Sequence, residues 1–400
     1  MSRIDDLIQE LCPAGVERKP LADLLDYEQP TKYLVSDKNY SDSYPTPVLT
    51  AGQSFLLGYT EEVEGIYPAS SNTPVIIFDD FTTSFHWVNF NFKVKSSAMK
   101  MITPKSDIEL DFRFAYYAMK VIKFEVSEHA RHWISVYSNF RIPLPPLEVQ
   151  REIVSILDKF TELEAELEAE LDAELEARKK QFKYFCDDLY SASYLDLISK
   201  NVTKTLGEIG SFTRGNGLQK SDLTSGGAGC IHYGQIFTFY KTQIFETKSF
   251  VSNEMANRLK KASKGDLIIA TTSENDADVC KAVVWLGSEE IGIGGETYIF
   301  RHNLDPLFSA YYFKSDLFQF QKHKKITGTK VRRVHGDAMA KFVIVVPEMQ
   351  HQILIGQTLS KLESLLESMD SGLPAEIAAR RKQYEHYRDQ LLTFKELKSA

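Results

Sequence analysis

The sequence predicts an α+β protein in which two mixed α/β globules are separated by two long antiparallel helices that form a coiled coil. Residues 142–191 align without a gap to residues 344–393 at a constant offset of 202. A repeat of this length indicates an internal duplication. Each copy follows a longer mixed segment, so globule and helix alternate twice along the chain. We therefore expect two similar halves related by pseudo-twofold symmetry.

The repeat is carried by identical or closely similar residues along its whole length. The matched pairs include Ile142 and Ile344, Pro145 and Pro347, Gln150 and Gln352, Leu157 and Leu359, Asp187 and Asp389, and Leu189 and Leu391. From the limits of the two copies we expect a first globule at 1–141 and a central helical region at 142–200. A second globule at 201–343 and a C-terminal helical region at 344–400 should follow.

Length and composition are typical of a globular protein with two domains. The chain has 400 residues, of which 43% are hydrophobic and 26% are charged, and this length is too great for a single core. No apolar run approaches the roughly 18 residues that span a bilayer, and the acidic N-terminus is unlike a signal peptide. The four cysteines lack the spacing of a zinc site or a disulfide framework. These observations predict a reduced, cytoplasmic protein.

Charge is distributed unevenly along the chain. The net charge is −8, but Lys and Arg outnumber Asp and Glu within residues 201–343, whereas acids exceed bases in each of the other segments. Local patches, more than the total charge, attract a polyanion. The second globule is therefore the stronger candidate for binding nucleic acid.

The first helical region has a narrow apolar stripe. Apolar residues recur at helical spacing from about Val149 to Leu189, directly after Pro145 and Pro146. Four successive Glu-Leu-Glu-Ala units or close variants begin at residue 162, and they consist of strong helix formers. About 40 residues at 1.5 Å each give a rod of roughly 60 Å. The stripe suits packing against one partner helix, and the second copy of the repeat supplies that partner. The alternative is an ordinary coiled coil with no further role.

The apolar positions of both helical regions are candidates for binding partner proteins. They are Ile153, Leu157, Phe160, Leu163, Leu167, Leu171, Leu359, Leu362 and Leu365.

The second helical region contains residues that interrupt helices. The segment 370–374, Asp-Ser-Gly-Leu-Pro, combines cap residues, a glycine and a proline that fits the first turn of a new helix. We expect a break or kink here, with helix at about 348–369 and 374–396.

The most basic segment of the chain is 322–333, Lys-His-Lys-Lys-Ile-Thr-Gly-Thr-Lys-Val-Arg-Arg. Its six basic residues suit contacts with phosphates, and an arginine can also bind guanine through two hydrogen bonds. The alternative is a solvated charged loop, but the positive balance of this globule favours nucleic acid. The DNA-binding candidates in the second globule are Arg214, Lys220, Gln235, Lys322, Lys324, Lys325, Lys330, Arg332 and Arg333.

The first globule has no comparable basic block. Its DNA-binding candidates are Gln29, Lys32, Gln53, Lys93, Lys95, Arg131 and His132. The sequence Gly-Gln-x-Phe occurs at residue 52 and again at residue 234, and Gln53 and Gln235 could each bind an adenine edge because a primary amide matches its donor and acceptor. The alternative is a glutamine that stabilises a turn beside glycine.

The chain lacks the motifs of common enzyme classes. The sequence has no Gly-x-x-x-x-Gly-Lys-Ser/Thr loop, no Gly-x-Ser-x-Gly, no His-Glu-x-x-His and no Asn/Asp-Pro-Pro-aromatic motif for methyl transfer to an amine. Asp79 and Asp80 follow a β-like run, but with no third ligand in view a turn at a strand end is the better interpretation. We expect neither catalytic nor metal-binding residues.

Two stretches resemble the conserved helical regions of the specificity subunit of type I restriction-modification enzymes. They are Ile142-Pro-Leu-Pro-Pro-Leu-Glu-Val-Gln-Arg-Glu-Ile-Val-Ser-Ile-Leu-Asp-Lys-Phe and Gly372-Leu-Pro-Ala-Glu-Ile-Ala-Ala-Arg-Arg-Lys-Gln-Tyr-Glu-His-Tyr-Arg-Asp-Gln-Leu-Leu. Tyr27-Glu-Gln-Pro-Thr-Lys-Tyr and Phe78-Asp-Asp-Phe-Thr-Thr resemble a target-recognition domain of the same family, so the resemblance covers essentially the whole chain. One departure is the second helical region, which has one proline where the first has three.

The resemblance implies a subunit without catalysis of its own. Each globule would be a target-recognition domain that binds one half of an asymmetric, interrupted sequence in double-stranded DNA. The helices would set the spacer and bind two modification (methyltransferase) subunits, and restriction (translocase–nuclease) subunits would join them. S-adenosylmethionine, ATP and Mg would be bound by those partner subunits. The alternative is a non-catalytic adaptor whose two globules on a coiled coil bind other proteins, which the acidity of the first globule and helix favours slightly.

Overall fold

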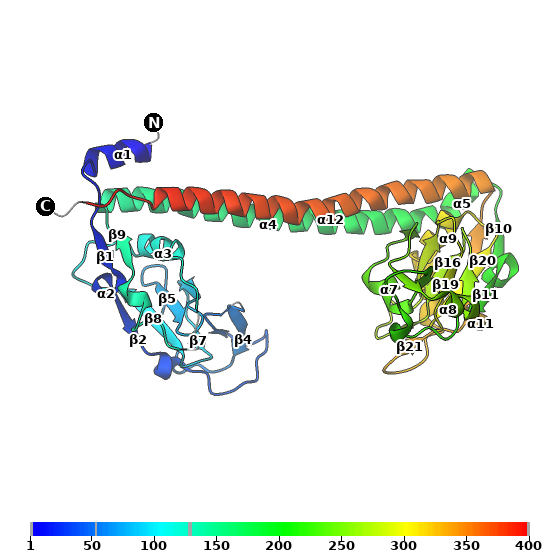
Figure 1. Ribbon diagram of the computed structural model, residues 1–400, viewed down its shortest axis with the longest axis horizontal. Helices are drawn as coiled ribbons and strands as arrows, with labels where there is room; N and C mark the ends of the chain where they lie inside the picture. The colour runs from blue at the N-terminus through cyan, green and yellow to red at the C-terminus, as the bar shows by residue number, and fades with distance from the viewer. Residues whose placement is uncertain (1–2, 53, 127–129, 398–400) are drawn as a thin grey trace. The chain divides into compact units, whose positions relative to one another are not determined.

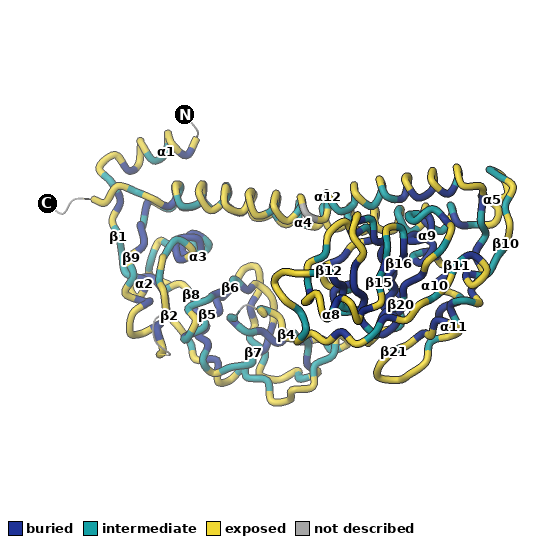
Figure 2. The backbone as a smooth tube through the Cα atoms, turned by 45° about the vertical axis from the view of Figure 1, so that its right-hand side comes forward, coloured by how far each residue is buried: buried dark blue, intermediate teal, exposed yellow. Residues whose placement is uncertain are grey.

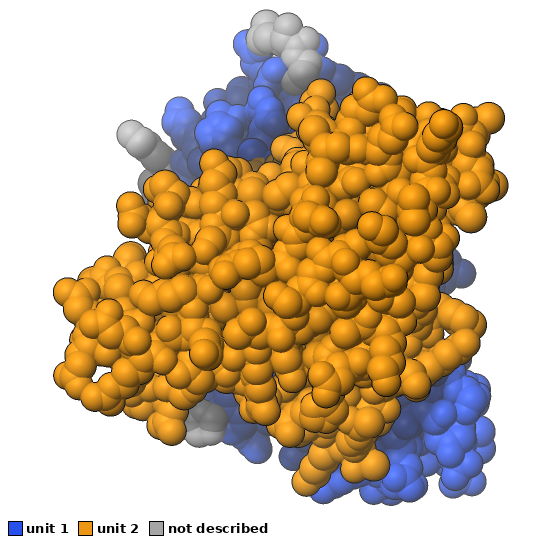
Figure 3. All heavy atoms as spheres, turned by 90° about the vertical axis from the view of Figure 1, so that its right-hand side faces the viewer, with its two compact units in different colours: residues 1–169, 376–400 blue, residues 170–375 orange. Residues whose placement is uncertain are grey.

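The computed structural model describes residues 3–52, 54–126 and 130–397. The chain forms two compact units, which are coloured separately in Figure 3. Unit 1 comprises residues 1–169 and 376–400, and unit 2 comprises residues 170–375. Each unit thus contains one globule together with a portion of each long helix.

Two β-sheets form the centre of the globule in unit 1 (Figure 1). One has the strand order β2–β8–β5–β6, and the other has the order β4–β3–β7. A separate antiparallel pair, β1–β9, joins the two ends of the globule. The strands are β1 (Arg18–Pro20), β2 (Leu25–Glu28), β3 (Thr46–Leu49), β4 (Leu56–Thr60), β5 (Val75–Asp79), β6 (Phe85–Val88), β7 (Lys93–Val94), β8 (Met99–Pro104) and β9 (Arg141–Pro143). The helices are α1 (Arg3–Leu11), α2 (Leu21–Leu24) and α3 (Phe112–Lys120), with short 3-10 helices η1 (Pro30–Tyr33) and η2 (Tyr137–Asn139).

The core of this globule follows the apolar runs of the sequence. Residues 75–78 of β5, Val-Ile-Ile-Phe, are fully buried, as expected of a strand covered on both faces. Helix α3 begins after its cap Asp111, whose carboxylate accepts hydrogen bonds from the backbone N–H groups of Arg113 and Phe114. The first turn of α3 is thereby fixed beside the sheet.

The globule in unit 2 has a larger set of sheets. The strand orders are β11–β20–β16–β18–β13 and β14–β12–β19–β15, with two separate pairs, β10–β22 and β17–β21. The strands are β10 (Val202–Thr205), β11 (Gly210–Arg214), β12 (Ala228–Ile231), β13 (Gln243–Ile244), β14 (Ser249–Val251), β15 (Lys260–Ala262), β16 (Leu267–Ala270), β17 (Thr272–Ser273), β18 (Lys281–Trp285), β19 (Ile291–Ile293), β20 (Thr297–His302), β21 (Arg332–Arg333) and β22 (Val343–Val346). The helices are α5 (Ala192–Ile198), α6 (Leu206–Ile209), α7 (Tyr233–Thr238), α8 (Asn253–Arg258), α9 (Pro306–Tyr312), α10 (Asp316–His323), α11 (Gly336–Met339) and the 3-10 helix η3 (Lys220–Asp222).

The two globules share one strand topology although their sequences have diverged. The order β2–β8–β5–β6 in unit 1 corresponds to β11–β20–β16–β18 in unit 2, and all neighbours in both series are antiparallel. In the second sheet, β3 pairs in parallel with β7, just as β12 pairs in parallel with β19. The internal duplication therefore includes the globules as well as the helices.

Two long helices complete the fold, and they match the sequence repeat. Helix α4 spans Leu147–Leu189 and helix α12 spans Met349–Leu391, each with 43 residues. Corresponding ends of these helices are separated by the same offset of 202 as the repeat. The predicted fold class of mixed globules with long helices is confirmed.

The predicted break in the second helix is wrong. Pro374 lies inside α12, which is a single helix through residues 370–374. A proline within a helix removes one backbone hydrogen bond and crowds the preceding turn. Packing of α12 against α4 on both sides of this position, at Leu362 and at Ile377, outweighs that cost because tertiary contacts supply most of the stability of a helix.

In unit 1 the first part of α4 runs antiparallel to the last part of α12 (Figure 1). Phe160 contacts Tyr387 with ring centroids 6.4 Å apart. Further along α4, Glu164 and Glu168 pair with the more N-terminal Arg381 at 3.1 and 2.8 Å. The residue numbers rise on one helix and fall on the other, which defines the antiparallel direction.

In unit 2 the remaining parts of the same helices also lie side by side. Lys179 of α4 is 3.9 Å from Asp370 of α12. Each helix also contributes to a globular core: Ile153 and Leu157 are buried in the core of unit 1, and Ile355 and Leu359 in that of unit 2. Elsewhere the helices are largely exposed (Figure 2). Within the described part of the chain, no helix is both long and apolar enough to span a membrane.

The C-terminal end of the chain returns to the first globule within unit 1. The backbone N–H of Val16 donates to Lys395 O at 2.8 Å, and Leu397 N–H donates to Val16 O at 3.0 Å. Gly15 precedes this contact with a φ of +111°, and a Cβ atom there would lie 2.7 Å from Lys395 O. Only glycine allows this approach.

Candidate functional site

The most basic segment of the sequence forms an exposed hairpin in unit 2, which we call the basic loop (residues 324–333). It follows α10 and ends in β21, on the side of the globule away from α4 and α12 (Figure 1). Thr327 and Arg333 exchange two backbone hydrogen bonds of 2.9 Å. Gly328, with a φ of +89°, makes the turn between them.

The basic loop carries four exposed cationic side chains. These are Lys324, Lys325, Lys330 and Arg333. The ammonium group of Lys324 lies over the ring of Phe320, 3.8 Å from its centroid, a cation–π contact that fixes its place on the surface. The surface can therefore meet several phosphates at once.

Arg332 differs from its neighbours because it stabilises the loop itself. Its Nε atom pairs with Asp276 Oδ1 at 2.8 Å, and its Nη1 atom donates to Gly328 O at 2.7 Å. The first contact ties the basic loop to the preceding β17–β18 connection, and the second stabilises the turn within the loop. We interpret Arg332 as part of the framework of the loop.

Arg214 and Arg333 lie close to one carboxylate. Their Nη2 atoms are 3.5 and 3.4 Å from the two carboxylate oxygens of Glu296, and Thr272 Oγ1 donates to the same carboxylate at 2.6 Å. The sequence did not single out Glu296 or Thr272, because both belong to segments far from the basic loop along the chain. Lys220, in η3, is exposed in the same globule.

Two lysines that were predicted to contact DNA are buried, so these two predictions are wrong. Lys93 is 3% exposed, and its Nζ atom donates to Glu64 O at 2.7 Å and pairs with Glu62 at 2.8 Å. Lys322 is fully buried and donates to Ala277 O at 2.9 Å, and its burial lowers the pKa of the amine. Each ammonium group holds a loop of its own globule and cannot reach a phosphate.

The predicted DNA contacts of Gln235 and His132 are also wrong, because both residues are buried. Gln235 is 8% exposed; its side chain accepts a hydrogen bond from His232 N at 3.0 Å and donates to Ser249 Oγ at 2.6 Å. It therefore stabilises the turn at the start of α7, which was the alternative interpretation. His132 is 6% exposed, so its imidazole faces the interior. Gln53 lies outside the described residues.

The remaining candidates of the first globule are at or near the surface. Gln29, Lys32 and Arg131 are exposed, and Lys32 pairs with Glu28 at 3.1 Å. Lys95 is half-buried and donates to the hydroxyl of Tyr40 at 3.1 Å.

Arg131 and Arg333 occupy corresponding positions in the two globules. The backbone N–H that follows Arg131 donates to Asp80 O at 2.8 Å, directly after β5. The N–H that follows Arg333 donates to Thr271 O at 3.3 Å, directly after the corresponding strand β16. The two arginines are 202 residues apart, so extending the repeat eleven residues toward the N-terminus would have related them.

The Asp79-Asp80 pair forms the predicted turn at a strand end. Asp79 Oδ1 accepts hydrogen bonds from the N–H groups of Phe81 and Thr82 at 2.9 and 2.8 Å. Asp80 is buried, pairs with the buried Lys100 at 3.1 Å and accepts from Trp133 N at 2.8 Å. This ion pair anchors the segment that presents Arg131.

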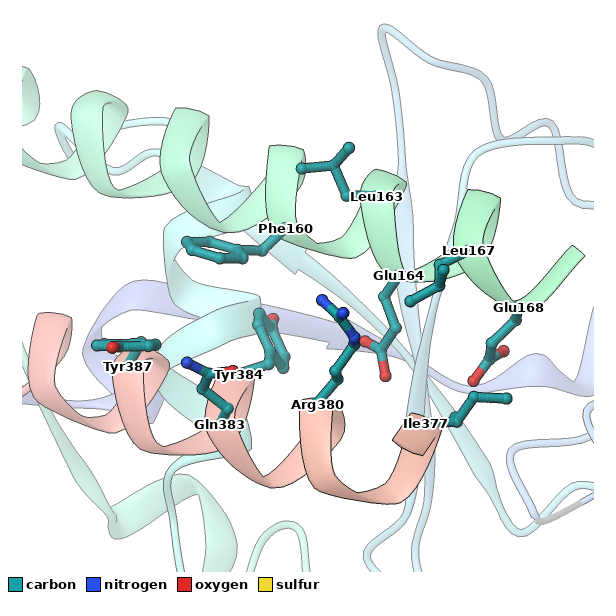
Figure 4. Close-up of a pocket in the computed structure, with 10 residues that line it drawn as sticks. All are labelled: Phe160, Leu163, Glu164, Leu167, Glu168, Ile377, Arg380, Gln383, Tyr384 and Tyr387. Atoms are coloured by element: carbon teal, nitrogen blue, oxygen red, sulfur yellow. The ribbon is translucent and has the colours of Figure 1, made fainter. Parts of the chain in front are cut away.

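A second kind of surface lies between the helices of unit 1. An apolar hollow, which we call hollow 1, opens between α4 and α12 (Figure 4). Its walls are Phe160, Leu163, Glu164, Leu167, Glu168, Ile377, Arg380, Gln383, Tyr384 and Tyr387. The aromatic rings of α12 and Phe160 of α4 face one another across it (Figure 4). Leu163 is 61% exposed, which is unusual for a leucine in an apolar setting.

Unit 2 has a similar hollow between its portions of the helices. Hollow 2 is lined by Glu174, Arg178, Gln181, Phe182, Phe185, Leu362, Leu365, Leu366, Ser368 and Met369. Phe160, Leu163 and Leu167 of hollow 1 correspond by the offset of 202 to Leu362, Leu365 and Met369. Arg380, Gln383, Tyr384 and Tyr387 likewise correspond to Arg178, Gln181, Phe182 and Phe185. The duplication has therefore preserved a surface as well as a scaffold.

The helix residues predicted to bind partners divide into two groups. Ile153, Leu157 and Leu359 are completely buried in the globular cores, so their assignment to a partner surface is corrected. Phe160, Leu163, Leu167, Leu362 and Leu365 line the two hollows. Leu171 is half-buried and lies outside both hollows.

Comparison with known proteins agrees with this architecture. Residues 13–177 match the family described as "Type I restriction modification DNA specificity domain". The chain is 37% identical over 405 residues to the EcoR124I/EcoR124II specificity subunit of Escherichia coli, with 98% of each chain covered. It is 28% identical over 408 residues to the putative specificity subunit S.HindORF215P of Haemophilus influenzae, covering 95% of this chain and 96% of that protein.

Solved structures show the same fold at low sequence identity. A chain from a structure of a type I R-M system superposes with a TM-score of 0.65 at 16% identity, covering 94% of this chain and 97% of the other. The HsdS subunit of Thermoanaerobacter tengcongensis gives a TM-score of 0.54 at 16% identity, with 96% and 97% covered. The 37% identity to the Escherichia coli subunit over 98% of the chain shows that the chain belongs to the specificity subunits of type I restriction enzymes. This is a class of recognition subunits, and the adaptor alternative is not favoured.

Proposed function

We propose that this chain is the DNA-recognition subunit of a type I restriction-modification complex, in which each globule binds one half of a bipartite, asymmetric site. Residues 1–141 and 201–343 would be the two target-recognition domains. The observation that carries this proposal is the corresponding placement of Arg131 and Arg333 in globules of one topology. Equivalent frameworks with different surrounding side chains suit two half-sites of different sequence.

The basic loop supports contact with duplex DNA. Its exposed bases lie on the side of the second globule away from the helices (Figure 1), which leaves the helices free for proteins. Cationic side chains of this kind neutralise phosphates and release counterions, while a fixed arginine can discriminate guanine. A role on DNA agrees with the cytoplasmic location expected from the sequence.

The two hollows support docking of two copies of one protein. A partner that binds hollow 1 through an apolar element meets similar residues again in hollow 2, because seven lining residues of each hollow correspond at the offset of 202. The modification subunits are the partners that the family resemblance suggests for the helical regions 142–200 and 344–400. Restriction subunits would then join this hetero-oligomer.

Chemistry would reside on these partners. S-adenosylmethionine for methyl transfer, and ATP with Mg for translocation and cleavage, would be bound by the modification and restriction subunits. The described residues of this chain supply binding surfaces: cations on the globules and apolar hollows on the helices.

Methylation mapping tests the proposal directly. The chain is co-expressed with its modification subunit in a host without other adenine methylation, and every methylated site in the genome is determined. We expect one motif made of two unlike half-sites separated by a fixed number of unspecified base pairs. Replacing residues 201–343 by the corresponding globule of a relative should change one half-site only. Absence of methylation that depends on this chain, or a motif without two parts, contradicts the proposed function.

A further inference from the structure

Two arginines from distant segments of unit 2 converge on Glu296. Arg214 is the last residue of β11, Arg333 is the last residue of β21, and Glu296 directly precedes β20. One carboxylate oxygen lies 3.5 Å from Arg214 Nη2 and the other lies 3.4 Å from Arg333 Nη2. Arg214 Nε also donates to Gly295 O at 3.0 Å. A single acidic group thus sets the direction of two cationic side chains.

The carboxylate is itself held from the interior. Thr272, which is 8% exposed, donates its hydroxyl hydrogen to Glu296 Oε2 at 2.6 Å. Thr272 is also the cross-strand partner of Arg333 in the β17–β21 pair, and Thr271 N–H donates to Glu296 O at 3.2 Å. Backbone and side-chain contacts therefore fix Glu296 before any ligand binds.

Both guanidinium groups keep donors available to a ligand. The side chains of Arg214 and Arg333 are 56% and 45% exposed. A guanidinium has five N–H donors, and the contacts above occupy only part of them on each arginine. The group of three has a net positive charge and faces solvent, as a DNA-contacting group must.

We infer that Glu296 is a positioning residue that holds Arg214 and Arg333 in one orientation and thereby makes the contact of the second globule with DNA selective for its half-site. This inference rests on the proposed function. A mobile arginine side chain can pair with a phosphate in many positions. A planar guanidinium that is held in place forms two hydrogen bonds only with an acceptor pair of matching position and orientation. Ordering the side chains before binding also reduces the entropy lost in the complex. Because Glu296 lowers the positive charge of the surface, its contribution is to selectivity and not to attraction.

The test compares two duplexes with the full chain assembled with its modification subunit. One duplex carries the site found by methylation mapping, and in the other the half-site of the second globule is scrambled. Glu296→Gln removes the charge that orients both arginines. We expect the ratio of the two affinities to fall about tenfold, the order of discrimination that a bidentate arginine provides. The affinity for the scrambled duplex should stay the same or rise, because a negative charge has been removed.

Thr272→Val is a second variant, which changes no charge. It removes the hydroxyl that holds the carboxylate while it keeps the shape of the side chain. We expect the affinity ratio to fall about threefold, which is less than for Glu296→Gln because the carboxylate keeps its charge beside both arginines. Glu254→Gln is the matched control, since Glu254 is exposed on α8 of the same globule and pairs with Arg258. It makes the same change in charge and should leave the ratio unaltered.

The outcomes separate the inference from the proposed function. An unchanged ratio in both Glu296→Gln and Thr272→Val overturns the inference. So does an equal loss of affinity for both duplexes together with a lower melting temperature, because that result describes a residue needed only for folding. If the wild-type assembly itself fails to distinguish the two duplexes, the proposed function is overturned and the inference falls with it.

Discussion

The side-chain amide of Gln150 connects the first long helix to the backbone of Asp111 in the first globule. Its Oε1 atom accepts from Asp111 N at 2.8 Å, and its Nε2 atom donates to Pro145 O at 2.8 Å. Gln352 makes the same two contacts in unit 2, accepting from Asp305 N at 2.9 Å and donating to Pro347 O at 2.8 Å. In both units the partner aspartate caps the next helix of the globule. One duplicated glutamine thus fixes helix to globule twice.

Replacing Gln352 by leucine should destabilise unit 2. The substitution keeps the size of this buried side chain but leaves Asp305 N–H and Pro347 O without their partner, which costs about 1–3 kcal/mol in free energy of unfolding. Denaturant unfolding of the full chain measures the change. Gln350→Leu, two residues earlier on the exposed face of α12, is the control. Equal effects of the two variants contradict the role given to Gln352.

The half-buried carboxylate of Glu363 gives the contact between α12 and the second globule a dependence on pH. Burial raises the pKa of Glu363. Its ion pair with Lys314 and the hydrogen bonds from Thr242 and Tyr311 lower the pKa by more than burial raises it, so the pKa in the folded chain is below the ordinary value. The stabilisation is therefore fully present above the pKa of an unfolded glutamate. It is lost as the pH falls through the lower pKa of the folded state.

Glu363→Gln should lower the free energy of unfolding by about 1.5–3 kcal/mol at neutral pH, the range for hydrogen bonds to a charged group. The difference from wild type should shrink in acid, where wild-type Glu363 is itself protonated. Thermal unfolding at pH 7 and in acid provides the measurement. Glu367→Gln, which breaks an ion pair with the exposed Lys241, should cost less than about 1 kcal/mol. A pH-independent difference would count against the ion pair.

Neutralising the basic loop should reduce the salt dependence of DNA binding. Lys324, Lys325 and Lys330 are changed together to alanine, and the slope of log affinity against log salt should become shallower by about one unit for each phosphate contact that is lost. Titrations at several salt concentrations give the slope. The control changes Lys241, Lys264 and Lys341, which are exposed in other loops of the same globule. Identical slopes for the two triple variants would remove the basic loop from the interface.

The hollows should each bind one modification subunit. Leu163→Asp places a charge in hollow 1, and Leu365→Asp does the same in hollow 2. Loss of one buried leucine is worth about 2 kcal/mol, so each variant should lower the affinity of one copy by at least tenfold, and the double variant should bind neither tightly. Native mass spectrometry counts the copies. Leu197→Asp is the control, because Leu197 is 83% exposed on α5 and belongs to neither hollow. Unchanged stoichiometry in the double variant contradicts this docking surface.

The continuity of α4 predicts how the spacer responds to its length. Adding one Glu-Leu-Glu-Ala unit within residues 162–177 lengthens a helix by roughly 6 Å. We expect the spacer between the half-sites to become longer, because α4 extends through both units and the globules must still contact compatible faces of a duplex that rises about 34 Å per turn. The half-sites themselves should stay the same, because the globules are unchanged. Methylation mapping shows the outcome. An unaltered spacer would exclude α4 as its determinant.

The helices could be predicted from the sequence because their signal is local and repeated. Periodic leucines defined α4, and the constant offset placed α12 at matching bounds. Pro374 was misjudged because a local rule was applied where packing on both sides of the proline decides the structure.

The site was harder to predict because burial depends on partners that are distant along the chain. Lys93 and Lys322 look like surface cations until Glu62 and the carbonyl of Ala277 are placed beside them. Glu296 carried no signal at all, since its importance lies in two arginines that only the fold brings near. By contrast, the exposed part of the basic loop was visible directly, because Lys324, Lys325, Lys330 and Arg333 lie close together beside a glycine, and unpaired charged residues are seldom buried.

The discontinuous composition of unit 1 bears on how the chain is made. Residues 170–375 leave the ribosome as an uninterrupted stretch that contains all of unit 2. Unit 1 lacks its portion of α12, and the backbone contacts with Val16, until residues 376–397 emerge. The half that is synthesised first is therefore the half that is completed last. A stop codon directly before residue 376 would leave the second globule intact and the first without its portion of α12.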